Sequence, residues 1–274
     1  MQPQPADDLV ERARQGDRAA FDRLVAPHLP RLRAVVRRLV GVSEGCDDIL
    51  QDTLVKAWRG LAGYRGDAAL ATWLTAIATR TALDHLRAGK RWRAEAQVAY
   101  ANLCYGSEEL SGEVMAAASA PDFAFEVREH VAYCFACVGR SLPPDEMAAL
   151  VLRDVMELSA REASTVLGTS DSVLRHRLSA ARQAMTDRFE GLCSLVSKAG
   201  ICHQCSGLQM LAAKDRRGGP FPDVASLADR IAVVRAAEPG SMEALHAIFW
   251  RRTAEIEAEG LGATTPDSGC GTEG

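Results

Sequence analysis

The chain has 274 residues, 47% of them hydrophobic and 25% charged, and a formal net charge of −4. Its length suits two modest domains plus further segments, and its composition is ordinary for a globular protein. It holds no apolar run of the roughly 18 residues that a membrane span needs, and residues 1–8 lack the basic and apolar parts of a signal peptide. We therefore expect a cytoplasmic protein with no membrane partner.

The net negative charge is unevenly distributed, with basic and acidic side chains in separate segments. Residues 80–93 hold five basic side chains against a single aspartate, whereas residues 94–127 hold six acidic side chains and no basic one. Nucleic acid is bound by a local positive face, so the net charge does not exclude it as a partner.

Residues 8–93 predict a first helical domain. Apolar side chains recur at helical spacing in four runs, at 9–25, 29–40, 47–61 and 70–86. Abundant Ala, Leu, Arg and Glu with only 5% aromatics also favour helices over strands. Glycines at positions 60, 63 and 66 predict a loop before the last run.

Residues 94–122 predict an acidic flexible linker, because the segment is rich in Ala and Ser and contains Gly106, Gly112 and Pro121. Residues 123–190 predict a second helical domain with a helix-turn-helix. Its short first helix ends at a turn at Gly168–Thr169, and its second begins after Ser170, whose hydroxyl suits an N-cap.

Beyond residue 190 the sequence predicts a cysteine-containing helical extension at 191–260, with helices near 224–237 and 242–259, and a disordered tail at 261–274. The expected fold class is therefore all-α. Two helical domains are joined by a flexible linker and followed by a helical C-terminal extension.

The second helix of the helix-turn-helix carries the residue types that read DNA. Arginine presents a planar fork of donors that matches guanine edges or phosphates. Arg175 and Arg182 are seven residues apart and share a face, which Ser172 and Ser179 extend with neutral donors. Surface arginines on a solvated helix are the alternative, and the glycine turn before the helix favours DNA contact.

Three groups of motifs resemble the extracytoplasmic-function sigma factors. Residues 47–58 (DDILQDTLVKAW) resemble the polymerase-binding helix of region two. The segment for promoter melting and minus-ten recognition is similar to YRGD at 64–67, TWL at 72–74, IA at 77–78 and DHLR at 84–87. Region four, which reads the minus-thirty-five element, is similar to LPP at 142–144, Ser159, Glu162, LG at 167–168, Ser170 and RHRL at 175–178. The resemblance covers residues 9–93 and 127–189, in the family's order.

The resemblance implies a transcription initiation factor that is not an enzyme, with core RNA polymerase and promoter DNA as partners and an anti-sigma factor as a further candidate. The implied polymerase-binding residues are Asp47, Asp48, Gln51, Asp52 and Lys56. The implied DNA-binding residues are Tyr64, Arg65, Trp73, Arg80, His85, Arg87, Lys90, Arg91, Ser172, Arg175, His176, Arg177, Ser179 and Arg182. Departures at Thr79-Arg80, Ser164 and Val173 leave the promoter sequence open.

Two other function classes remain, and the weaker is a thiol oxidoreductase using Cys134 and Cys137, whose motif usually accompanies a βαβ pattern that is not apparent here. A helix-turn-helix regulator that acts without polymerase would need the second domain only. The charged helix at 47–58 and the basic segment after Trp73 favour the sigma factor, because a simple regulator does not require them.

Eight cysteines in a cytoplasmic chain indicate metal or thiol chemistry more than structural disulfides. Cys134/Cys137 and Cys202/Cys205 form two Cys-x2-Cys pairs, which predict a tetrahedral zinc site. His130 and Cys193 are alternative ligands, and His130 with the first pair resembles the zinc motif of anti-sigma factors. A thiol redox switch, an iron–sulfur cluster or ordinary buried cysteines are the alternatives.

We expect the extension to regulate the chain by masking the Arg175–Arg182 face or the polymerase-binding surface.

Overall fold

The computed structural model describes residues 5–41, 45–118, 127–205, 222–237 and 244–260. Within these ranges every regular element is helical, and the exception is one isolated bridge between Cys193 and Cys202. The all-α prediction is confirmed. None of the described helices is long and apolar enough to cross a membrane. The predicted tail at 261–274 lies outside the described residues.

The first domain is a bundle in which α5 is the central helix. Its elements are α1 (Pro5–Arg14), α2 (Arg18–Val25), α3 (Leu29–Val40), α4 (Gly45–Gly60) and α5 (Leu70–Ala88), with short 3-10 turns at Ala26–His28 and Leu61–Gly63. Helices α3 and α4 both pack against α5. Phe21, Leu32 and Leu74 are buried, and Phe21 meets Trp58 edge-to-face with ring centroids 5.1 Å apart.

The second domain contains α8 (Val127–Gly139), α9 (Pro144–Leu150), a π-helical turn (Val151–Val155), α10 (Ala160–Leu167) and α11 (Asp171–Leu192). A capping box starts α10: the Ser159 hydroxyl accepts from the Glu162 amide, and the Glu162 carboxylate accepts from the Ser159 amide. Gly168 ends α10 in the left-handed conformation, with φ 62° and ψ 40°. A glycine adopts that conformation at low cost, which sets the turn into α11.

The expected flexible linker is more ordered than its composition predicts. Helices α6 (Ala96–Gly106) and α7 (Glu108–Ala118) occupy most of it. Its alanines favour helix, and tertiary contacts hold both helices. Tyr100 meets Phe249 of the extension at 5.3 Å between ring centroids, and Arg252 donates to Glu113 at 2.7 Å. The glycines that indicated flexibility are tolerated within and at the end of these helices.

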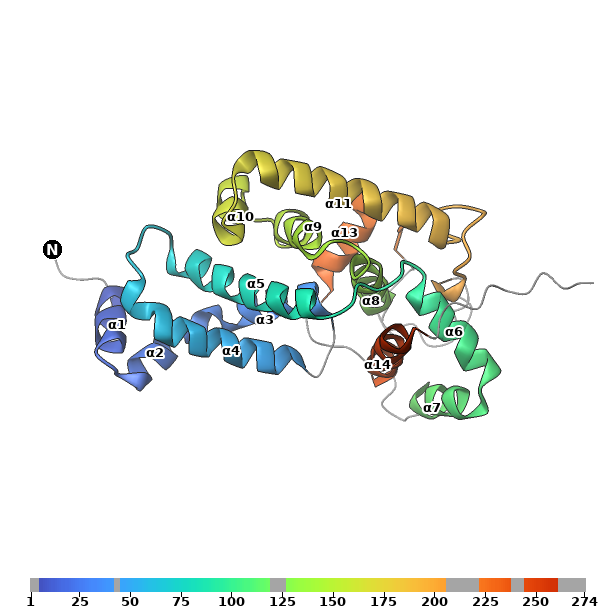
Figure 1. Ribbon diagram of the computed structural model, residues 1–274, viewed down its shortest axis with the longest axis horizontal. Coiled ribbons are helices and arrows are strands. Elements are labelled where there is room, and N and C mark those ends of the chain that lie inside the picture. The colour runs from blue at the N-terminus through green and yellow to red at the C-terminus, as the bar shows by residue number, and fades with distance from the viewer. Residues whose placement is uncertain (1–4, 42–44, 119–126, 206–221, 238–243, 261–274) are drawn as a thin grey trace, which may run out of the picture.

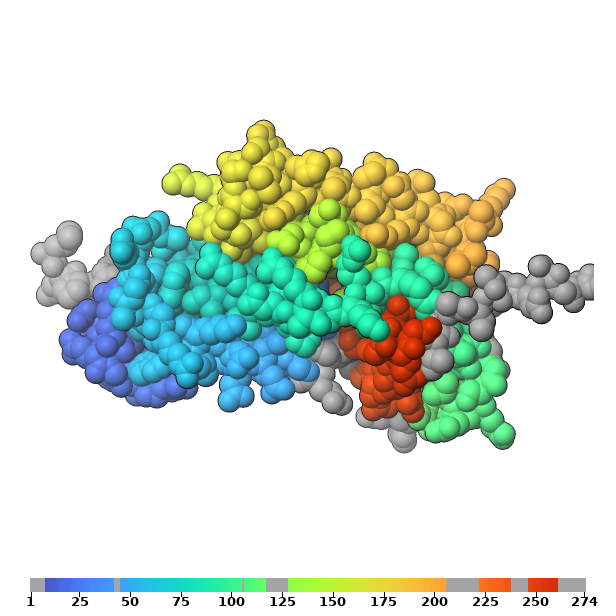
Figure 2. Space-filling model, viewed as in Figure 1, coloured from blue at the N-terminus to red at the C-terminus, as the bar shows by residue number. Residues whose placement is uncertain are grey.

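The C-terminal extension forms α13 (Leu227–Ala236) and α14 (Ala244–Glu259), close to the predicted positions. Helix α13 packs against α8 and the π-helical turn, and α14 packs against α6, α7 and α8. Figure 1 shows α9–α11 lying over α5, with α13 behind α9 and α14 beside α8 and α6. Figure 2 shows the second domain resting directly on α5 along this face. The two domains are therefore in contact, and the extension lies close to both of them.

The capping box gives a prediction for stability. Ser159→Ala removes the acceptor for the Glu162 amide, so the free energy of unfolding should fall by about 1 kcal/mol. Denaturant unfolding followed by circular dichroism measures it. Ser179→Ala, at an exposed position within α11, is the control and should leave stability unchanged. Equal stability of the two variants would contradict a stabilising role for the capping box.

Candidate nucleic-acid and protein interfaces

One face of α4 is charged and open to solvent. Its apolar side, with Ile49, Leu50 and Ala57, is buried. The predicted polymerase-binding residues Asp47, Asp48, Gln51, Asp52 and Lys56 are all exposed on the other side. The two aspartates of the first turn also complement the positive helix N-terminus. The structure therefore brings the whole predicted set onto one accessible helix face.

The loop before α5 is held by an aromatic contact. Tyr64 and Trp73 lie 5.1 Å apart between ring centroids, and the Tyr64 hydroxyl donates to the Ala68 carbonyl at 2.9 Å. Arg14 of α1 donates to the Tyr64 carbonyl. Both rings are half-buried, while Arg65 is exposed. Trp73 therefore shapes the loop, and Arg65 is the side chain that solvent reaches freely.

The basic end of α5 faces the rest of the chain. The predicted residues Arg80, His85, Arg87, Lys90 and Arg91 remain exposed there. Arg87 donates to both carboxylate oxygens of Asp145 at 3.1 Å, and Lys90 donates to the Ala258 carbonyl of α14 at 3.2 Å. Sequence reasoning did not identify Asp145 and α14 as neighbours, because their partners lie 58 and 168 residues away.

On α11 the structure separates the predicted residues into two groups. Leu174, Leu178 and Met185 are buried against the second domain. Ser172, Arg175, His176, Ser179 and Arg182 are exposed, and a shallow groove runs along this face. Arg177 is half-buried and pairs with Asp145 at 3.4 Å. Arg177 thus lies toward the first domain, away from the exposed face.

Arg182 already has a carboxylate partner. Its guanidinium donates to Asp154 in a two-pronged pair at 2.6 and 2.7 Å, and these hydrogen bonds raise the pKa of Arg182 above its ordinary value. A DNA phosphate would have to compete with Asp154 for this side chain. Arg175 has no such carboxylate partner in the described part of the chain, so it is the arginine most available to a groove.

The cysteines fall into two places. Cys134, Cys193, Cys202 and Cys205 are all buried and interact electrostatically with one another. Cys137 instead packs with Trp92, Tyr133 and Trp250. Three of the four predicted ligands therefore lie near the alternative Cys193, while Cys137, which also interacts with Cys134, packs in an aromatic cluster. Among the described residues no three His, Cys, Asp or Glu side chains already have metal-binding geometry.

The other alternative ligand has a different neighbour. His130 of α8 stacks on His246 of α14, with Nδ1 and Nε2 3.3 Å apart. Burial lowers the pKa of His130 to about 4 and that of His246 to about 3. Both imidazoles are therefore neutral at physiological pH, and their stack joins the extension to the second domain.

Comparison with known proteins supplies the family. Residues 24–93 match the family described as Sigma-70 region 2, and residues 135–185 match Sigma-70, region 4. RNA polymerase sigma-H factor of Pseudomonas aeruginosa is 31% identical over 185 residues, which cover 67% of this chain and 93% of that protein. The chain belongs to the extracytoplasmic-function sigma factors. ECF RNA polymerase sigma-E factor of Escherichia coli K12 is likewise 31% identical over 184 residues, or 67% of this chain and 94% of the relative.

Two solved structures are also similar. CnrH in complex with the cytosolic domain of CnrY has a TM-score of 0.44 and 26% identity, covering 66% of this chain and 96% of that one. Sigma factor RpoE in complex with the anti-sigma factor NepR from Bartonella quintana has a TM-score of 0.41 and 20% identity, covering 62% and 96%.

Membership of this family establishes what the chain does. Sigma factors bind core RNA polymerase and direct promoter-specific initiation, and they are not enzymes. Region two, at 24–93, contains α4 and α5, and region four, at 135–185, contains α9, α10 and most of α11. The alternative of a regulator that needs only the helix-turn-helix does not account for the region-two match. The extension that follows α11 lies outside both matches.

The buried histidine pair predicts a pH dependence of stability. The unfolded chain takes up protons near pH 6.5, whereas the folded pair resists them until about pH 4. Stability is therefore full above pH 6.5 and should fall as pH drops toward 4, by up to about 1.4 kcal/mol per pH unit for each group. Denaturant unfolding between pH 7.5 and 5 should show a flatter profile for His246→Asn, whereas the exposed-site control His85→Gln should keep the wild-type slope. A wild-type slope in His246→Asn would exclude this origin.

Proposed function

We propose that this sigma factor is held in a closed form by its C-terminal extension, and that opening exposes it to promoter DNA. The exposed acidic face of α4 meets core polymerase, because complementary charge steers association and fixes register. The exposed face of α11 reads the minus-thirty-five element, and the loop after Leu61 with the basic end of α5 binds the minus-ten strand. With these partners the chain works in the cytoplasm.

The contact between the two sigma regions carries this proposal. The two promoter elements lie about 25 base pairs apart, which is roughly 85 Å of duplex at about 3.4 Å per base pair. Here α10 and α9 pack directly on α5. Regions two and four cannot read both elements while they remain in this contact, so promoter recognition requires them to separate.

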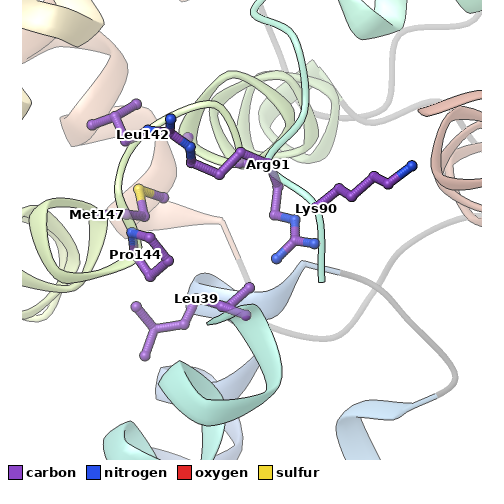
Figure 3. A pocket seen from close by; sticks show the side chains of 9 residues that line it. Leu39, Lys90, Arg91, Leu142, Pro144 and Met147 are labelled. Carbon is purple, nitrogen blue, oxygen red and sulfur yellow. The ribbon is translucent and has the colours of Figure 1, made fainter. Parts of the chain in front are cut away.

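The seam between the regions is apolar and edged by charge. Leu39 and Leu86 of region two meet Leu142, Pro144 and Met147 around a narrow pocket, and Lys90 and Arg91 extend at its rim (Figure 3). Beside it, Asp145 pairs with Arg87 of region two and Arg177 of region four. These ion pairs are partly exposed and contribute little on their own. The apolar contact is therefore the larger part of the seam.

The extension contacts both sides of this seam. Helix α13 packs on α8, and its Val234 carbonyl accepts a hydrogen bond from Arg38 of region two at 2.6 Å. Trp250 of α14 meets Trp92 in a tilted ring contact, with the ring centroids 4.6 Å apart, and it lies so close to Gly41 that a Cβ there would collide with its ring. The extension thus fastens the end of α3 and the segment after α5 to the second domain.

The described contacts favour a different mode of regulation from the expected masking of a binding surface. Within the described residues the extension covers neither the α4 face nor the exposed face of α11. It acts by joining the two regions, and it engages the basic segment after α5 through Arg93, which makes three hydrogen bonds to Glu257 at 2.5–3.1 Å. The regulating signal reaches the extension through its metal- or thiol-bearing cysteines.

Promoter reading by α11 is tested with Arg175→Ala. Loss of its donors should weaken binding of holoenzyme to minus-thirty-five DNA by about 1–3 kcal/mol and leave binding to core polymerase unchanged. Lys198→Ala, an exposed basic position outside the region-four match, is the control. A promoter affinity equal to that of the control would remove Arg175 from the interface.

Closure by the extension is tested with a matched pair on α14. Glu257→Gln removes the carboxylate that accepts from Arg93, and a hydrogen bond to a charged group contributes about 1.5–3 kcal/mol. Glu255→Gln changes a carboxylate whose partner among the described residues is Arg252 of the same helix. Promoter-dependent transcription with added core polymerase should rise several-fold for Glu257→Gln and stay at the wild-type level for Glu255→Gln. Equal output from both variants would show that this contact does not restrain the factor.

A further inference from the structure

Four cysteine thiols come from two segments that are far apart in the sequence. Cys134 comes from α8, Cys193 follows the last turn of α11, and Cys202 and Cys205 lie in the loop beyond. The bridge between Cys193 and Cys202 sets two of them side by side, with the Cys202 amide donating to the Leu192 carbonyl at 2.7 Å. Gly200 packs on the Cys193 backbone and has no room for a Cβ, so this close return of the chain requires glycine.

Nitrogen donors surround these sulfurs. The Gln97 amide donates to Cys134 Sγ at 3.3 Å, and the Arg230 guanidinium donates to Cys193 Sγ at 2.9 Å. Hydrogen bonds of this kind orient the ligands of metal–thiolate centres and stabilise their charge.

Arg230 is the most informative neighbour. Its side chain is 1% exposed and lies 4.1 Å from the Phe189 ring centroid. Within the described residues no carboxylate lies within 4 Å of its guanidinium. A buried cation is costly unless a negative group lies beside it. Neutral thiols do not supply that charge, whereas four thiolates around a divalent ion carry a net charge of −2.

We propose that Cys134, Cys193, Cys202 and Cys205 bind one divalent ion of the zinc class, with Arg230 as its charge-balancing neighbour. The ion enters as four thiols lose their protons to solvent, giving a four-sulfur complex without any redox step. Four sulfur ligands select zinc over hard cations such as magnesium. The four side chains are not yet in metal-binding geometry, so binding draws the 202–205 loop and Cys134 together around the ion.

This site differs from the one that sequence spacing favours. Two Cys-x2-Cys pairs suggest Cys134 and Cys137 as partners, but Cys137 packs among Trp92, Tyr133 and Trp250. Cys193 takes its place. The inference deepens the proposed regulation of the extension, because the ion would fix the segment that leads from α11 to α13. Metal content is measured without polymerase, so the metal site and the closed form can each fail alone.

The first experiment measures metal by mass spectrometry on the full chain, purified under reductant after expression with Zn²⁺. The wild type should carry about one zinc per chain. Cys193→Ser should lose the metal, and Cys137→Ser and Cys104→Ser should keep it. Metal-free wild type, iron in place of zinc, or loss in Cys137→Ser with retention in Cys193→Ser would each overturn the proposal.

The second experiment separates ligation from misfolding. Co²⁺ added to the metal-free full chain should give the intense visible and charge-transfer bands of a tetrahedral four-sulfur site, with unchanged far-ultraviolet circular dichroism. Arg230→Gln should weaken Co²⁺ affinity roughly 10–100-fold, and Arg230→Lys, which keeps the charge, should recover much of the loss. Bands of a site with oxygen ligands, or equal affinities for all three proteins, would contradict this assignment.

Discussion

The apolar seam between α5 and the second domain is the contact on which the rest of this structure depends. Leu86 and Leu39 on one side meet Leu142 and Met147 on the other, and Met147 comes so close to Gly139 that a Cβ there would have no room. Once these residues leave water, the basic end of α5 must lie against region four. The ion pairs at Asp145 and the docking of α14 on Trp92 follow from that placement.

The same placement explains how the basic segment of an acidic protein is neutralised. The arginines and lysine around residue 90 would repel one another if they were free, and acidic groups from remote parts of the chain meet them. Asp145 of region four and Glu257 of the extension each contact an arginine of this segment. In the proposed closed form, these contacts would withhold part of the basic charge from promoter DNA.

The extension gives the chain something that the two sigma regions do not require. Its helices contact region two through Arg38 and Trp92 and region four through α8. Three of the gathered cysteines lie between α11 and α13, and Cys134 comes from α8. Arg230 of α13 donates to Cys193. This hydrogen bond and one turn of α13, from Arg230 to Val234, link the thiols to Arg38 of region two.

Much of the molecule followed from local pattern. Apolar periodicity predicted the bundle helices, and the exposed faces of α4 and α11 carry the predicted charged residues, because which side of a helix is buried follows from spacing alone. The local sequence pattern was less informative where contacts between distant segments determine the structure. Residues 96–118 are helical because α14 packs on them, and Arg177 and Arg182 are engaged by aspartates that no local motif marks. By itself the sequence determined the family, the helices and the candidate contacts, since these depend on side chains within a few turns. Only the tertiary structure decided that Cys193 joins the thiols in place of Cys137 and that the two regions close on each other, because both depend on contacts between segments about 40 to 170 residues apart.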